Sequence, residues 1–143
     1  MVRYDMIALT VPLPQRSWLV RVYIAYQPAD VPEICHSLTS IGCNQEALAE
    51  ARHHLSGSSH DKGLTYSNLA ERISVVAVGQ SLHQSGTINT LSHELLHVVS
   101  HICERDGINM YSEEPCYMLG TLFEYISQLI SEHSSAAPLS PPC

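Results

Sequence analysis

The most regular pattern of the sequence is TINTLSHELLHVVSHICERDG, residues 87–107. Its large apolar side chains recur at intervals of three and four residues, which is the period of one face of an α-helix. Gly107, two residues after Arg105, is typical of the end of a helix. The pattern therefore predicts a long amphipathic helix with one buried face. The apolar positions are Ile88, Leu91, Leu95, Val98, Val99 and Ile102.

Three segments before this helix are rich in β-branched and aromatic residues, as strands are. They are residues 6–11, 18–26 and 72–78. The turn LPQRS separates the first two, so we expect them to pair as a hairpin. LTYSN, residues 64–68, is expected to add extended structure before the third strand.

Helix-capping residues predict three more helices. Asp30 and Glu33 have the spacing of a capping box, and Gly42 stands where that helix should stop. Asn44 is placed to cap a second helix that runs to about residue 54. Ser112 is placed to cap the last helix. The apolar stripe of that helix is Leu119, Leu122, Ile126, Leu129 and Ile130.

The order of strands and helices predicts an α+β layer fold in one domain. A chain of 143 residues with 45% hydrophobic residues can bury a sizeable core. We expect the domain to span residues 1–132, and the Pro- and Ser-rich tail, residues 133–143, to be disordered.

Charge and apolar patterning exclude two classes of partner. The formal net charge is -7, and the 7 Lys and Arg residues do not cluster, so nucleic acid is not an expected partner. No stretch reaches the length of apolar residues that a membrane span needs, and no signal peptide is recognised.

The five cysteines form no CxxC pair, which excludes a zinc finger. A cytoplasmic protein with reduced thiols is expected.

The central helix carries the motif HExxH at residues 93–97. Residues four apart lie on one helix face, so His93 and His97 can direct one ring nitrogen each at a single ion. Zinc takes such nitrogen ligands and, in catalytic sites, keeps one position for water. Glu94 would lie beside the metal and accept a proton from that water. The motif therefore predicts Zn²⁺ as cofactor and Glu94 as general base.

A third protein ligand is expected from the following helix. Glu113 and Glu114 come after the break at Gly107, and either could swing back to the metal. Acidic residues at a helix N-terminus also simply complement the helix dipole, so one of the pair is expected to have only that role. His101 lies about 12 Å along the helix from His93, too far to share the ion easily. Cys103 is expected to face away from it.

Residues 64–123 resemble a group of small zinc metallopeptidases of phage and prophage type. Such proteins look like minimal gluzincins, with an HExxH helix followed by a glutamate ligand on the next helix. In the group that glutamate precedes a Tyr-Leu-x-Gly-like segment by four residues. Residues 117–120 match this segment with Met118 in place of leucine, so the resemblance implies Glu113 as the third ligand and Glu114 as the alternative. Glu113, Tyr117 and Gly120 fall on one face of the last helix, and Gly120 would let this face approach the HExxH helix closely.

The resemblance also implies a zincin-like fold, with a small twisted sheet of about three to four strands packed on the HExxH helix and a second C-terminal helix. The strand at residues 72–78 would be the edge that binds an extended peptide. Tyr111, Tyr117, His83 and His101 are candidates for stabilising the transition state or contacting the ligands, but simple packing is the favoured role of each.

The sequence therefore predicts a zinc-dependent metallopeptidase that acts on a peptide or protein substrate, in a phage-infected or prophage-carrying bacterial cell. Two alternatives stay open. One is a repressor-cleaving regulatory protease of a mobile element. The other is a non-catalytic, zinc-stabilised structural or phage/host-interaction module, which a closed fourth metal position would favour.

Overall fold

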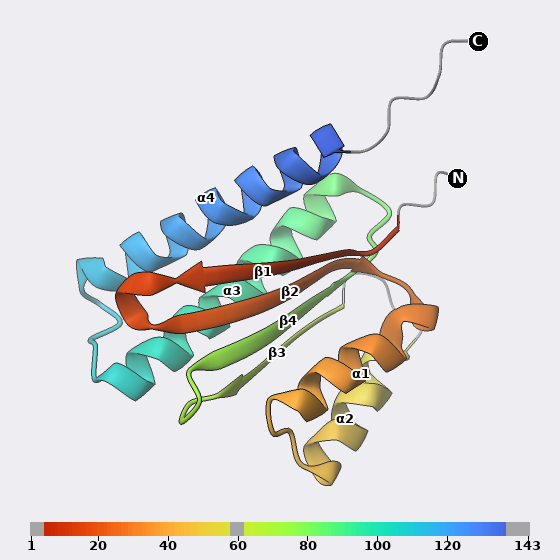
Figure 1. Cartoon of the computed structure of the whole chain (residues 1–143), viewed down its shortest axis with the longest axis horizontal. Helices are drawn as coiled ribbons and strands as arrows, with labels where there is room; N and C mark the ends of the chain where they lie inside the picture. The colour runs from red at the N-terminus through yellow and green to blue at the C-terminus, as the bar shows by residue number, and fades with distance from the viewer. Residues whose placement is uncertain (1–4, 58–61, 137–143) are drawn as a thin grey trace.

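A four-stranded mixed sheet forms the centre of the molecule (Figure 1). The structure, a computed structural model, describes residues 5–57 and 62–136. The strand order is β1-β2-β4-β3, in which β2 and β4 are parallel and the two outer pairs are antiparallel. The strands are β1 (Ile7–Leu13), β2 (Trp18–Tyr26), β3 (Gly63–Asn68) and β4 (Ile73–Gly79).

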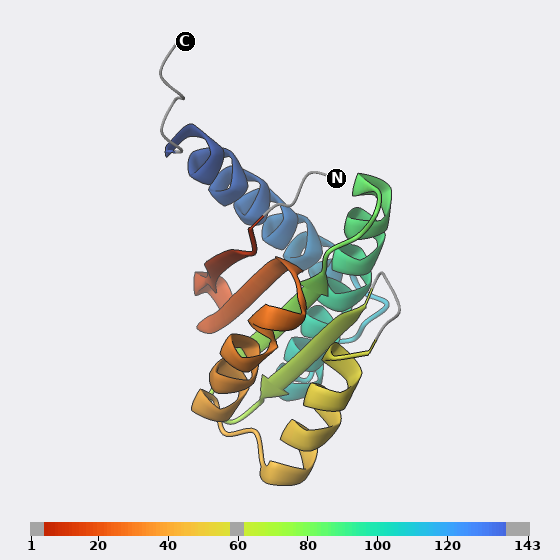
Figure 2. The same cartoon turned by 90° about the vertical axis from the view of Figure 1, so that its right-hand side faces the viewer.

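Helices cover both faces of this sheet, which gives three layers (Figures 1 and 2). β4 shows the division, because Val76 and Val78 pack against α3 and α4 while Val75 and Ala77 pack against α1 and α2. The α+β class is thus confirmed. The helices are α1 (Val31–Ser40), α2 (Gln45–Leu55), α3 (Gln84–Asp106) and α4 (Glu113–Ala136).

The hairpin of β1 and β2 is confirmed, with Leu13 opposite Trp18 at its turn. The extended structure expected at residues 64–68 is β3. The expected role of residues 72–78 as an edge strand is wrong, because β4 lies between β2 and β3. Its buried apolar run explains this, since a strand covered on both faces shows no alternation. The edge beside α3 is β3.

The predicted helix ends at Gly42, Asn44 and Gly107 are confirmed. Helix α1 stops just before Gly42, which has a positive φ of 95°. The Asn44 side chain accepts a hydrogen bond from the Ala47 backbone N–H at 2.8 Å, and Gly107 takes the left-handed conformation after α3. The capping box at Asp30 is wrong. Pro28 starts a short 3-10 turn (Pro28–Asp30) before α1, and the Asp30 carboxylate accepts from the Gln27 N–H instead.

The last helix begins at Glu113, as Ser112 predicts, and continues to Ala136. It therefore passes the expected domain boundary at residue 132. Residues 137–143 of the expected tail lie outside the described part of the chain. Within residues 5–57 and 62–136, no helix combines the length and apolar character that crossing a membrane requires.

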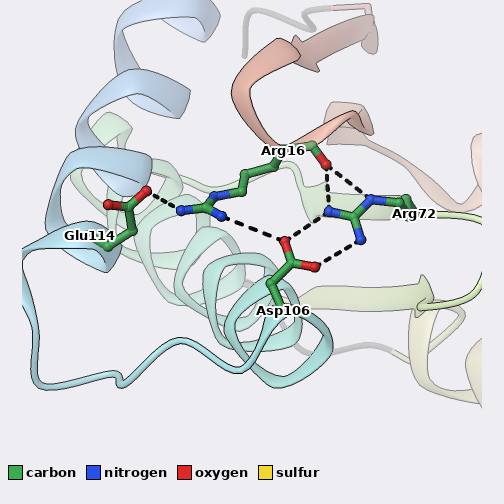
Figure 3. A network of polar contacts seen from close by, with 4 residues as sticks. All are labelled: Arg16, Arg72, Asp106 and Glu114. Atoms are coloured by element: carbon green, nitrogen blue, oxygen red, sulfur yellow. Dashed lines mark hydrogen bonds and ion pairs between the residues drawn. The ribbon is translucent and has the colours of Figure 1, made fainter.

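A cluster of charged side chains ties four elements together at one end of the sheet (Figure 3). Arg72, immediately before β4, donates two hydrogen bonds of 2.8 Å to Asp106 at the end of α3. Arg16, in the β1–β2 turn, pairs with Asp106 and with Glu114 in the first turn of α4. This end of α4 is therefore held near the C-terminal end of α3.

Replacing Asp106 by asparagine is expected to lower the stability at neutral pH by roughly 1 kcal/mol. The hydrogen bonds from Arg72 hold the pKa of Asp106 below its usual range. Such a carboxylate stabilises the fold above its unfolded-state pKa of about 4, and the effect disappears as the pH falls through the lower folded-state value. Urea unfolding should therefore show a difference between wild type and variant that is full at about pH 7 and shrinks toward about pH 3. A difference that stays constant would contradict the ion pair.

Candidate functional site

His93 and His97 converge on the outer face of α3. Their Nε2 atoms lie 3.2 Å apart, and the ring planes meet at 75° with centroids separated by 4.8 Å. The His93 side chain is 67% exposed, and His97 is also exposed. The spacing of four residues places the rings on consecutive turns of one face. The pair is therefore open to solvent and to a ligand.

Glu94 is buried beside this pair. Its Oε1 atom lies 3.9 Å from Nε2 of His93. Its Oε2 atom accepts a hydrogen bond of 2.6 Å from the Thr65 hydroxyl on β3. The same hydroxyl lies 3.1 Å from the backbone oxygen of Glu94. Thr65 therefore fixes one carboxylate oxygen and leaves the other directed toward the histidine pair.

Gly63 makes room for the Glu94 carboxylate at the start of β3. A Cβ atom on Gly63 would lie 2.8 Å from Cγ and Oε1 of Glu94 and 2.8 Å from Cγ2 of Thr90. These separations are too short for any side chain. A glycine is therefore needed where the edge strand passes closest to α3.

Gly63→Ala and Gly120→Ala are expected to change the stability in opposite directions. Gly63→Ala forces Glu94 or β3 to move and should cost about 1–3 kcal/mol. Gly120 lies in the middle of α4 with no atom within 4 Å of a Cβ, so alanine there should add about 0.5–1 kcal/mol through helix propensity. Urea unfolding of the two variants measures both effects. A stabilising Gly63→Ala would contradict the close contact between β3 and Glu94.

His101 extends the row of histidines along α3. Its ring centroid lies 6.3 Å from that of His97, and its Nδ1 atom lies 2.7 Å from the Ser67 hydroxyl on β3. Burial, and secondly the neighbouring His97, lower the pKa of His101, while Glu104 partly opposes this. Both effects favour the uncharged imidazole.

The structure does not bring the expected third ligand to the histidine pair. Glu114 pairs with Arg16, in the cluster that contains Asp106. Asp106 is nine residues beyond His97, about 13 Å along α3. Glu113 is exposed in the same first turn of α4. Among the residues that the structure describes, no three His, Cys, Asp or Glu side chains gather where a metal ion could be held.

The face of α4 that carries Glu113, Tyr117 and Gly120 is directed at solvent. Tyr117 is 71% exposed, and Gly120 has open space around it. The expected close approach of this face to the HExxH helix is therefore wrong. The apolar stripe of α4 is buried in its place, because it covers the sheet and α3. The buried residues are Met118, Leu122 and Ile126.

The remaining candidates lie apart from the pair or face away from it. Tyr111 is 97% exposed in the loop before α4. His83 immediately precedes α3, ten residues before His93, which is about 15 Å along the helix. Cys103 is buried in the core, so the expectation that it faces away from the metal position is confirmed.

Three residues of β3 belong to the site and were not singled out from the sequence. Gly63, Thr65 and Ser67 alternate along the strand and all face α3. Leu64 and Tyr66 pack on the opposite side. The alternation of small or hydroxyl residues with larger ones is the signal that could have marked this face.

No family model, no curated protein and no solved structure matches this chain. The class of the protein is therefore defined by its own fold and site: an α+β protein whose HExxH helix lies against the edge strand of a mixed sheet.

Proposed function

We propose that the protein is a zinc-dependent metallopeptidase in which His93 and His97 bind the metal and Glu94 acts as general base. One observation carries the proposal. The two Nε2 atoms lie 3.2 Å apart, and a buried carboxylate oxygen lies 3.9 Å from one of them.

The histidine pair fits two corners of a tetrahedral zinc site. Two nitrogen ligands with bonds of about 2.0–2.1 Å should lie about 3.3 Å from each other. The observed Nε2 separation of 3.2 Å agrees with this value. When bound, zinc supplies a Lewis acid that lowers the pKa of a coordinated water to about 7.

The protein's own groups supply the rest of the chemistry. Glu94 accepts a proton through Oε1, which faces the pair, while Thr65 keeps Oε2 in place. Because the carboxylate is buried and held by β3, it needs little reorganisation when the proton arrives. General-base catalysis requires such a carboxylate within reach of the reacting water.

The edge strand β3 supports a peptide as substrate. The Gly79 N–H donates to the Lys62 carbonyl at 2.7 Å, so the even-numbered residues of β3 pair with β4. In an antiparallel ladder the alternate residues then direct their backbone groups away from the sheet. These are Gly63, whose carbonyl oxygen lies 2.8 Å from Nε2 of His54, and Thr65 and Ser67, whose side chains contact Glu94 and His101 respectively. An extended peptide that adds to this edge would lie along the candidate site.

A third ligand from α4 remains part of the proposal, and it requires the start of α4 to move toward the histidine pair, because neither Glu113 nor Glu114 lies beside the pair in this structure. Glu113→Ala is expected to weaken zinc binding more than Glu114→Ala, because Glu114 already pairs with Arg16. Isothermal titration of the two metal-free variants with zinc measures which of them binds the metal more weakly. A larger loss for Glu114→Ala would assign the ligand to that residue instead.

The proposal is tested with a library of unstructured fluorogenic peptides. The wild-type protein should cleave a subset of them, lose this activity in a chelator and recover it when zinc is added. Cleavage that survives the chelator would contradict a metal-dependent mechanism. A protein that binds one zinc and cleaves nothing would be a non-catalytic zinc module.

A further inference from the structure

A chain of hydrogen bonds leads from the core to His101. The Trp18 indole N–H donates to the Ser74 hydroxyl at 2.9 Å. The Ser74 and Ser67 hydroxyl oxygens lie 2.7 Å apart, and Ser67 lies 2.7 Å from Nδ1 of His101. The four residues belong to β2, β4, β3 and α3, so the chain crosses the sheet and ends at the row of histidines.

The direction of the chain follows from its buried end. An indole nitrogen only donates, so the Ser74 oxygen accepts, and the Ser74 hydrogen needs another acceptor. Ser74 is fully buried, and the Ser67 oxygen is the acceptor that its hydroxyl contacts among the described residues. The Ser67 hydrogen is then directed at Nδ1 of His101. The opposite direction would bury the Ser74 hydrogen without an acceptor, which is unfavourable.

We propose that Trp18, Ser74 and Ser67 hold His101 as the neutral tautomer that carries its proton on Nε2. Nδ1 is then an acceptor within the protein, and Nε2–H is a donor. A nitrogen that bears a proton cannot bind a cation, so His101 is not a metal ligand. It presents an N–H on the same helix face as His93 and His97 and suits an oxygen atom.

Its ligand is the carbonyl oxygen of a bound substrate, a role that rests on the proposed function. His101 is partly exposed and lies four residues beyond His97. Ser67 is on the edge strand to which an extended peptide would add, so the donor stands at the same edge as the peptide. Trp18, Ser74 and Ser67 act as positioning residues, because they reach a substrate only through His101.

The tautomer is measured on the metal-free, full-length, ¹⁵N-labelled protein. Long-range ¹H–¹⁵N spectra distinguish a ring nitrogen that bears a proton from one that does not, and His101→Gln assigns the signals. At neutral pH we expect a bare Nδ1 and a protonated Nε2. A proton on Nδ1 would overturn the proposal whether or not the protein hydrolyses peptides.

One serine variant and one threonine variant test the chain of hydrogen bonds. Ser67→Ala removes the donor and should leave His101 as a mixture of tautomers. Thr65→Ser, two residues away on the same face of β3, keeps its hydroxyl and should leave the His101 spectrum unchanged. A Ser67→Ala spectrum identical to wild type would show that the chain does not set the tautomer.

The binding of a substrate carbonyl by His101 is tested separately, by peptide-cleavage kinetics. In a protein that cleaves peptides, Ser67→Ala and His101→Gln should lower kcat/KM about tenfold and leave zinc affinity unchanged. An unchanged kcat/KM would overturn the carbonyl-binding role. Absence of any hydrolysis by wild type would contradict the proposed function, while the spectra would still decide the tautomer.

Discussion

The double variant His93→Ala/His97→Ala is expected to lose more than about 100-fold in zinc affinity, because it removes the two proposed ligands and even outer contacts of a metal site contribute 10–100-fold. The fold should persist, since both imidazoles are exposed on α3 and lie outside the core. Zinc content of the purified protein and titration of the metal-free form measure the loss, and far-ultraviolet circular dichroism checks the helices.

A matched control for this variant is available on other helices. His53 on α2 and His133 on α4 are also exposed, and alanine at both positions removes two imidazoles without touching the candidate site. This control should keep one zinc per chain. Equal zinc content in wild type and in the His93/His97 variant would end the metal hypothesis.

Glu94→Gln is expected to abolish hydrolysis while zinc stays bound. Glutamine has nearly the same shape, and its amide oxygen can still accept the hydrogen bond from Thr65. It cannot take a proton from water, and loss of a general base lowers rates by about 10²–10⁴-fold. The rate of peptide cleavage and the zinc affinity are measured on the same preparation.

Glu104→Gln is the control for this substitution, because Glu104 lies on the same helix but is exposed. It should change neither cleavage nor metal binding. A Glu94→Gln protein that cleaves peptides at the wild-type rate would remove Glu94 from the mechanism and leave the histidine pair without its base.

The strands and helix ends that depend only on neighbouring residues were predicted correctly from the sequence. β2 matches residues 18–26, because a run of β-branched and aromatic residues has few alternatives to a strand. Asn44 and Gly107 define helix ends through chemistry that depends only on their neighbours. The position of β4 inside the sheet and the orientation of α4 depend on contacts between distant segments, and these were predicted wrongly.

Some residues of the candidate site could be predicted from local sequence, and others could not. His93, Glu94 and His97 are recognisable because a helix brings a fixed spacing onto one face. Gly63, Thr65 and Ser67 contribute through packing of β3 on α3, across about 30 residues of chain, which no spacing rule describes. The prediction of Glu113 as a ligand came from a resemblance. Glu113 begins α4, and the buried apolar stripe of that helix lies on a different face from Glu113.

Diffraction from zinc-soaked crystals, recorded at the zinc absorption edge, locates the metal relative to His93 and His97. We expect one anomalous peak at about 2.0–2.1 Å from Nε2 of both His93 and His97, with the Glu94 carboxylate beside it and not bound to it. A peak elsewhere, or rings that turn apart with no metal between them, would contradict it.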